Sequence, residues 1–226
     1  EEENVKVTVG GSGRKRRICE HYKLSGKNRQ VMLNGTEFQS KTIKEKTGKS
    51  EKKKIVCIGT IGINKNQLQL IRAVSFLPEK LKTEIEIDII GRQSDEIDIK
   101  NEIKVRKLDK IVKWKEFIPR ELLVDIWSDA CLNVVMSKSE GFGLSIIEGY
   151  AFGVPTLAFS DIDAVLDLYD PDAMMLIPER TDEEVVAYLI KALEKNWDSE
   201  YIRTFSTRYS IKKISEQYNE IYMGYM

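Results

Sequence analysis

Beyond about residue 54, short apolar runs alternate along the chain with segments of helical periodicity. The expected strands cover residues 55–58, 85–90, 111–114, 132–136, 156–159 and 174–177, and the expected helices cover 65–77, about 95–110, a segment opening at Pro119, 144–152, 182–195 and 211–222. Alternation at this spacing indicates βαβ units with right-handed crossovers and a parallel sheet covered on both faces. The predicted fold class is α/β, with a Rossmann-like, doubly wound parallel sheet.

Sheets of this kind bind ligands where the carboxyl ends of strands meet the N-termini of helices. Three glycines follow expected strands at this edge: Gly59, Gly91 and Gly141. We therefore expect the main pocket of the protein to lie beside them.

The first 53 residues have a different character. They open on an acidic, Gly/Ser-rich stretch (1–13), continue with an expected short basic helix (14–24) and an expected strand (29–33) closed by Asn34-Gly35, and end in an almost wholly polar segment (39–54). The last of these is typical of a linker. We divide the chain into residues 1–53, a Rossmann-like domain at 54–210 and a C-terminal helix at 211–226.

Charge and cysteine content narrow the classes of function. The 36 basic and 36 acidic residues cancel, which argues against a dedicated nucleic-acid binder. Cys19, Cys57 and Cys131 are far apart and odd in number, which favours free thiols in a reducing cytoplasm. With His21 as the only histidine, we expect no metal site. No apolar run is long enough for a membrane span and no signal peptide opens the chain; it begins with Glu, as a processed, trimmed or excised piece would.

The segment from Ser137 to Pro155 is the most informative for chemistry. It follows an expected strand, contains Gly141 and Gly143, and opens an expected helix at about Gly143. Glycines let a backbone approach a ligand closely, and the first N–H groups of a helix are unpaired. A phosphate or an anionic sugar oxygen is a natural partner for such a helix end.

Two glutamates border this helix. Glu148 is the only charge between residues 144 and 159, and a buried carboxylate is costly unless it is paired or hydrogen-bonded. Glu140 lies just before the helix, within reach of the same ligand. Two interpretations stay open on the residues alone: both glutamates bind a ligand, or Glu140 caps the helix and Glu148 meets an arginine elsewhere in the chain.

The glutamates and their neighbours resemble a known family. Glu140 and Glu148 are separated by seven residues, with Gly-Phe-Gly-Leu after the first and Gly-Val-Pro after the second. This pattern is similar to the E-x7-E signature of the retaining GT-B glycosyltransferases of family 4, group 1. The resemblance covers residues 28–222 and includes the first strand-to-helix loop (59–67), the second strand with its glycine (87–91), the segment 117–123 and the Asn-Gly of segment 29–38. It implies that the chain is the C-terminal, donor-binding domain of such an enzyme and that residues 1–33 are the tail of its N-terminal domain.

The resemblance also assigns roles. Glu140 is expected to contact the transferred sugar and Lys65 to neutralise the diphosphate, which makes these two the predicted catalytic residues. The predicted donor-binding residues are Glu148, which would bind the ribose, together with Gly59, Thr60, Gly141, Phe142, Gly143 and Leu144. Base recognition is expected from main chain near residues 113–119.

The implied partners are a nucleotide sugar such as a UDP- or GDP-hexose and, through the N-terminal domain, a sugar or lipid-linked acceptor. No cofactor and no metal are implied. The implied role is synthesis of a bacterial cell-surface polysaccharide or glycolipid, in the cytoplasm or peripherally at the inner face of the membrane, with any membrane contact made outside this part of the chain.

Three departures from the family pattern qualify these expectations. Thr60 stands where the family usually has Arg, and Asp161-Ile-Asp-Ala164 replaces a glycine pair. Most of an N-terminal domain is also missing. This chain alone is therefore expected to transfer sugar poorly or not at all. An inactive nucleotide-binding or scaffold module of the same fold is the main alternative. A sugar phosphorylase or a nucleotide-sugar epimerase is a third, although no lysine stands out as a pyridoxal phosphate ligand.

Overall fold

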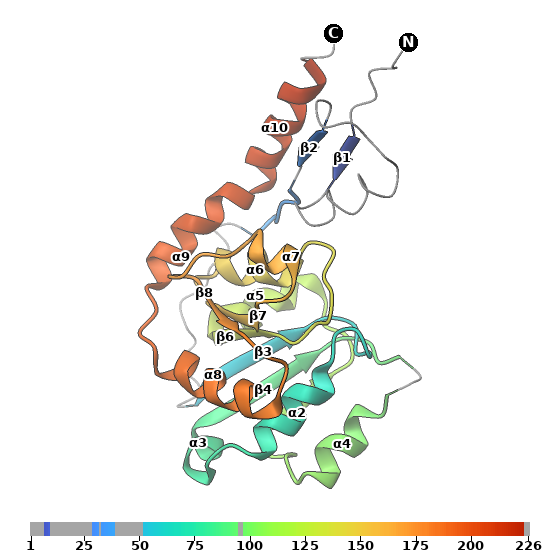
Figure 1. The fold of residues 1–226 in the computed structure, drawn as a ribbon, viewed down its shortest axis with the longest axis vertical. Helices are drawn as coiled ribbons and strands as arrows, with labels where there is room; N and C mark the ends of the chain where they lie inside the picture. The colour runs from blue at the N-terminus through green and yellow to red at the C-terminus, as the bar shows by residue number, and fades with distance from the viewer. Residues whose placement is uncertain (1–6, 10–28, 32, 39–51, 95–96, 224–226) are drawn as a thin grey trace.

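The fold is an α/β domain built on six parallel strands (Figure 1). This computed structural model describes residues 7–9, 29–31, 33–38, 52–94 and 97–223. The strands of the main sheet are β3 (Lys53–Ile58), β4 (Ile85–Ile90), β5 (Val112–Lys115), β6 (Ala130–Val135), β7 (Thr156–Phe159) and β8 (Met174–Ile177). The helices are α2 (Gln67–Ser75), α3 (Glu79–Glu84), α4 (Ile99–Val105), α5 (Arg120–Asp129), α6 (Leu144–Ala151), α7 (Asp163–Leu166), α8 (Asp182–Glu194), α9 (Ser199–Ser206) and α10 (Ile211–Met223), with a 3₁₀ turn, η3 (Thr207–Tyr209), before α10.

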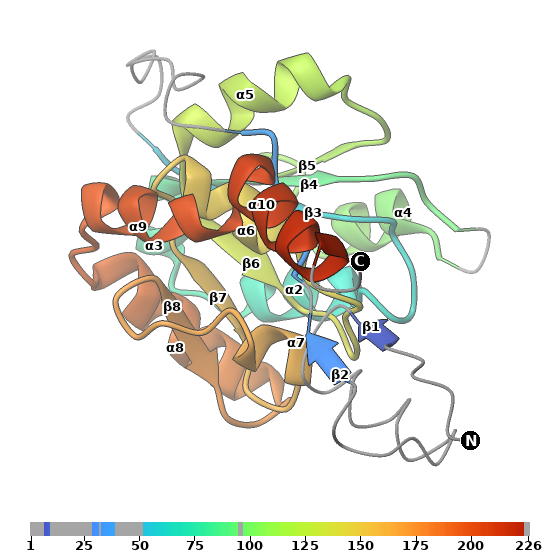
Figure 2. The same cartoon turned by 90° about the horizontal axis from the view of Figure 1, so that it is seen from above.

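The strand order is β5-β4-β3-β6-β7-β8, so the chain runs outward from β3 in one direction and then outward from β6 in the other. Helices α2, α4 and α8 cover one face of the sheet, and α5, α6 and α9 cover the other (Figure 2). The predicted doubly wound parallel sheet is confirmed. Its topological switch point lies between β3 and β6, and crevices at such points are where open α/β sheets bind ligands.

Successive residues of β3 show why both faces need helices. Ile55 and Cys57 pack into the cluster that contains α2, whereas Val56 packs with Ile126 and Trp127 of α5 on the opposite face. All four residues of β7 are buried as well. Nearly continuous apolar strands are typical of parallel sheets buried on both sides.

The strands at 85–90, 156–159 and 174–177 have the predicted bounds, but the polar segment predicted as a linker ends earlier than expected. Lys53 and Lys54 belong to β3 rather than to a linker. The ammonium of Lys53 donates to the carbonyl of Leu193 (2.7 Å), and that of Lys54 lies 3.7 Å from the Asp88 carboxylate. These partners let charged residues begin a strand.

Several helices differ from the prediction. Helix α2 begins at Gln67 rather than at residue 65, because Asn66 has a left-handed backbone (φ 54°) that a helix cannot include. Helix α4 is seven residues long instead of spanning about 95–110, since Asp98 caps its start and Lys107 (φ 56°) follows its end. Helices α3, α7 and α9 were not predicted.

The N-terminal segment supplies a second, two-stranded parallel sheet, β1 (Val7–Val9) with β2 (Arg29–Val31). The expected strand at 29–33 is thus present but shorter, and its pairing with residues 7–9 was not predicted. Residues 33–38 then run beside the start of α10, where the Thr36 amide donates to the carbonyl of Tyr209 (2.8 Å). The expected helix at 14–24 and most of the expected linker lie outside the described residues.

Candidate active site

The loop after β3 is shaped by its neighbour after β4. The Gly59 amide donates to the carbonyl of Ile90 (2.9 Å), and a Cβ added to Gly91 would lie only 2.0 Å from the Gly59 oxygen. Only a glycine at position 91 permits this approach. The two predicted glycines therefore meet each other, which sets the direction in which the first loop leaves the sheet.

Gln67, the first residue of α2, holds the same loop from inside. Its side chain is buried, donates to the carbonyls of Gly59 (3.3 Å) and Thr60 (3.2 Å), and accepts from the Gly62 amide (3.3 Å). The side chain of Lys65 then passes over Gly59, with its Cε 3.4 Å from where a Cβ of Gly59 would be. This path brings the ammonium toward the loop that follows β6.

The loop after β6 carries Glu140. Its Oε1 accepts from the ammonium of Lys65 (2.6 Å) and from the hydroxyl of Ser137 (2.5 Å), and the Glu140 side chain is 8% exposed. The Asn64 amide group donates to the Ser139 carbonyl (3.0 Å), and the Ser139 hydroxyl donates back to Asn64 (2.8 Å). The two loops are thus joined, and the predicted catalytic pair, Lys65 and Glu140, is in direct contact.

Helix α6 points its N-terminus at these residues. Gly143 is its N-cap with a left-handed backbone (φ 95°), and the helix receives no side-chain cap. The interpretation of Glu140 as a helix cap is therefore wrong. The first amides of α6 keep their capacity to bind an anion, as helix N-termini generally do.

Glu148 lies one turn further along α6. Burial raises the pKa of its carboxyl, and Arg120 at the start of α5, whose guanidinium is 3.9 Å away, partly offsets this effect. The arginine anticipated in the second interpretation therefore exists. Its contact is long, however, and Arg120 also lies over the ring of Phe38 and near Glu37, so Glu148 is only weakly compensated.

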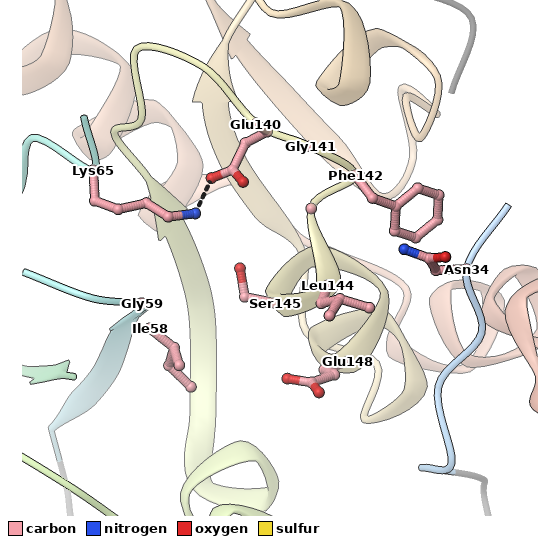
Figure 3. A pocket seen from close by; sticks show the side chains of 11 residues that line it. Asn34, Ile58, Gly59, Lys65, Glu140, Gly141, Phe142, Leu144, Ser145 and Glu148 are labelled. Carbon is pink, nitrogen blue, oxygen red and sulfur yellow. Dashed lines mark hydrogen bonds and ion pairs between the residues drawn. The ribbon is translucent and has the colours of Figure 1, made fainter. Parts of the chain in front are cut away.

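These residues enclose a pocket of about 500 Å³ at the switch point of the sheet (Figure 3). Its lining comprises Asn34, Ile58, Gly59, Lys65, Glu140, Gly141, Phe142, Gly143, Leu144, Ser145 and Glu148. In the figure, Lys65 and Glu140 lie together on one side, and Glu148 lies further along α6. A pocket thus lies beside Gly59 and Gly141, whereas Gly91 does not line it and supports the loop of Gly59 instead.

The structure brings together every predicted catalytic and donor-binding residue except Thr60, which is exposed and does not line the pocket. The segment 113–119, expected to recognise the base, does not line this pocket either. The structure also adds Asn34, Ile58 and Ser145, which were not predicted as site residues. Ser145 stands inside the motif itself, whereas Asn34 was interpreted as part of a strand-closing turn and of the Asn-Gly that resembles the family, without a role in the site. Its place at the pocket depends on the long-range pairing of Thr36 with Tyr209, which leaves no local signal.

The Cys57 thiol beneath this site is not a reactive group. Burial raises its pKa to about 12, so the thiol stays protonated at neutral pH. Within the described ranges, no three His, Cys, Asp or Glu side chains gather as a metal site would need. No helix among the described residues is long and apolar enough to cross a membrane.

Comparison with known proteins agrees with this geometry. The family model of glycosyl transferases group 1 matches residues 39–208, well over half of the chain. The chain belongs to this family. An uncharacterized glycosyltransferase of Haemophilus influenzae is 27% identical over 184 residues, which cover 79% of this chain and 51% of the relative. A poly(glycerol-phosphate) alpha-glucosyltransferase of Bacillus subtilis is 30% identical over 139 residues, which cover 61% of this chain and 19% of the relative.

Solved structures show that the fold is the Rossmann-like domain of the GT-B glycosyltransferases. Anabaena HepE, in complex with UDP and glucose, superposes with a TM-score of 0.77 at 16% identity, over 97% of this chain and 63% of that one. At this identity the likeness concerns the fold alone. This group 1 glycosyltransferase chain spans about half the length of its Haemophilus relative.

Proposed function

We propose that this chain is the donor-binding part of a retaining glycosyltransferase that takes a nucleoside diphosphate sugar. The observation that carries the proposal is the convergence of the Lys65 ammonium, the uncapped N-terminus of α6 and two carboxylates on one pocket. A cation and helix amides suit a diphosphate, and carboxylates suit hydroxyl groups. A sugar nucleotide contains both kinds of group in a fixed order.

The spacing along α6 gives the donor a direction. Glu148 lies roughly 7 Å along the helix axis from Gly143, at about 1.5 Å per residue. With the diphosphate at the helix N-terminus beside Lys65, the ribose reaches Glu148 and the sugar reaches Glu140. As the bond to the sugar breaks, negative charge grows on the leaving diphosphate, and Lys65 and the α6 amides stabilise it. In the retaining mechanism proposed here, that phosphate accepts the proton of the incoming hydroxyl.

The remaining parts of the proposal concern the whole protein. The acceptor, a sugar or a lipid-linked sugar, would be bound by a domain outside this chain, so we expect donor binding but little transfer from the chain alone. The buried Cys57 thiol is free, which suits a reducing compartment, and we propose that the protein is cytoplasmic. We extend the proposal to a UDP-sugar donor and a cell-surface polymer as product. The poly(glycerol-phosphate) alpha-glucosyltransferase of Bacillus subtilis supports a polymeric product, and the complex of Anabaena HepE with UDP and glucose supports the donor.

One experiment separates the roles of the two glutamates. Calorimetry would give the affinity of UDP and of UDP-glucose, then of the GDP and ADP pairs, for the parent, Glu140→Gln and Glu148→Gln. We expect Glu148→Gln to weaken nucleotide and nucleotide sugar alike. Glu140→Gln should remove the extra affinity due to the sugar while binding the free nucleotide at least as tightly, because Lys65 loses its competing partner. Glu121→Gln, on the exposed side of α5, is the matched control.

An inactive nucleotide-binding module remains the second candidate, and the absence of a cation at position 60 favours it. In such a module, Glu148→Gln would still weaken binding of the nucleotide. The sugar would add no affinity, so Glu140→Gln would have no such contribution to remove. If neither substitution alters ligand binding in a folded protein, both candidates and the site itself are wrong.

A further inference from the structure

The position of Glu140 depends on a residue three places earlier. Ser137 is buried, and its hydroxyl donates to Oε1 of Glu140 (2.5 Å). The Lys65 ammonium donates to the same oxygen. Both bonds therefore go to Oε1, and in the described part of the chain Oε2 is left available to a sugar hydroxyl. The orientation of the Glu140 carboxylate therefore depends on the contacts that hold Ser137 in place.

Arg180, in the loop between β8 and α8, fixes Ser137. One Nη2–H of its guanidinium donates to the main-chain carbonyl of Ser137 (3.0 Å). The same group makes a two-pronged contact with Asp161, from Nε to Oδ2 and from Nη2 to Oδ1, both at 2.7 Å. Its Cζ also lies over the Phe159 ring, 4.2 Å from the ring centre.

The backbone of Arg180 is held independently of its side chain. The amide group of Gln69, buried in α2, donates to the Arg180 carbonyl (2.7 Å). The main chain of Arg180 is thus held by α2, and its guanidinium is held by Asp161 and Phe159. A planar fork held in this way is pre-organised, so its bond to Ser137 has one geometry.

We propose that Arg180 is a positioning residue for recognition of the donor sugar, acting through Ser137 on the carboxylate of Glu140. The inference rests on the proposed function and deepens it. Asp161, in the segment that departs from the family's glycine pair, holds the guanidinium in place. The bond from Arg180 keeps Ser137 under Glu140, and the anchored Oε1 then presents Oε2 to the sugar. The nucleotide end of the donor, at Lys65 and Glu148, does not depend on this chain of contacts.

The test compares nucleotide and nucleotide sugar in the same variants. Calorimetry with UDP and UDP-glucose, or the pair that the parent binds best, gives the ratio of the two affinities. Arg180→Met should lower this ratio about tenfold and leave the affinity for the free nucleotide within about twofold, because charged hydrogen bonds of this kind carry such factors. Arg180→Lys should restore little, since an ammonium cannot reproduce the fork. Combining Arg180→Met with Glu140→Gln should add nothing to Glu140→Gln alone.

Arg72→Met is the matched control. Arg72 also joins two elements of the same face, with its Nε 3.1 Å from the Asp182 carboxylate, but it does not contact Ser137. It should cost stability and leave the affinity ratio unchanged. If Arg180→Met does not fold, Asp161→Asn, which keeps the arginine and weakens its anchor, should lower the ratio by a smaller factor.

The outcomes are separable. If Glu140→Gln lowers the ratio but neither Arg180→Met nor Asp161→Asn does, Arg180 is only structural and the inference is wrong. Equal losses for nucleotide and nucleotide sugar in the Arg180 variants would overturn it as well. If the parent binds no nucleotide or nucleotide sugar at all, the proposed function fails, and this inference fails with it.

Discussion

At the scale of single residues, the site holds charges that are only partly compensated. Lys65 and Glu140 neutralise each other across 2.6 Å, whereas Glu148 is buried with a guanidinium 3.9 Å away. Each carboxylate can therefore gain from a ligand. Glu140 can exchange a lysine for sugar hydroxyls, and the weakly compensated Glu148 can accept hydrogen bonds from ligand hydroxyls. Their residue types were readable from the sequence, but their pairing was not, because Lys65 and Glu140 are 75 positions apart.

Lys65 should contribute directly to diphosphate binding. Lys65→Ala should weaken UDP by about 1.5–3 kcal/mol, the range for hydrogen bonds to charged groups. Calorimetry of the parent and the variant measures this difference. Lys138→Ala removes an exposed lysine from the neighbouring loop and should have no comparable effect. Equal affinity of Lys65→Ala and the parent would remove Lys65 from the site.

Glu148 should also make stability depend on pH. Because burial raises its pKa in the folded state, the folded protein holds this proton more tightly than the unfolded chain. Stability is therefore lost as pH rises from about 4.5, the ordinary value, through the raised pKa. Glu148→Gln should unfold at a higher temperature than the parent at pH 7, with the difference shrinking below pH 4.5. Glu121→Gln should show no such trend, and a destabilised Glu148→Gln at pH 7 would contradict the assignment.

At the scale of elements, the loops are built by contacts that no single segment contains. Gly91 allows Gly59 to approach, Gln67 holds the loop from α2, and Asn64 joins it to the loop of Glu140. The apolar strands were predictable because burial on both faces leaves a direct trace in composition. Helices α3 and α9 were missed although Pro78 and Asp198, at their N-caps, are start signals.

The site was predictable to a different extent. Residues 140–148 are contiguous, so their motif could be recognised in one stretch. Asn34, Arg120 and Arg180 reach the site from three other places in the chain, through contacts that depend on tertiary packing. The segments 29–38 and 117–123 resemble the family, but no local pattern shows that their Asn34 and Arg120, or Arg180, reach this pocket.

A comparison of two glycines tests the role of loop packing. Gly91→Ala places a Cβ 2.0 Å from the Gly59 oxygen, so backbone must move, and we expect a loss of about 2–4 kcal/mol in the free energy of unfolding. Gly62→Ala, in the loop that Gly91 supports, meets nothing closer than a serine hydroxyl at 3.7 Å and should be nearly neutral. Urea denaturation of both variants measures the difference. Similar stabilities would show that the approach of the two loops is not required.

At the scale of the whole molecule, the pocket lies where the two halves of the sheet diverge, between β3 and β6. The loop after β3 supplies Lys65, the loop after β6 supplies Glu140, and α6 supplies Glu148. A ligand in this position contacts elements from both halves at once. Binding should therefore stabilise the domain as a unit rather than a single loop.

Ligand binding should accordingly raise the melting temperature of the entire domain. A nucleotide sugar at 100 times its dissociation constant stabilises the folded state by about 2.7 kcal/mol. For a chain of this size that corresponds to a rise of roughly 5–10 °C, at about 2–4 °C per kcal/mol. A thermal-shift panel of UDP, GDP, ADP and CMP with their sugars measures it, with inorganic phosphate at equal concentration as the control for ionic effects. A shift with one base and its sugar identifies the donor class, and the same shift should fall in Lys65→Ala and Glu148→Gln but persist in Glu121→Gln. If no nucleotide shifts the melting temperature more than phosphate does, the pocket at the switch point does not bind a sugar donor.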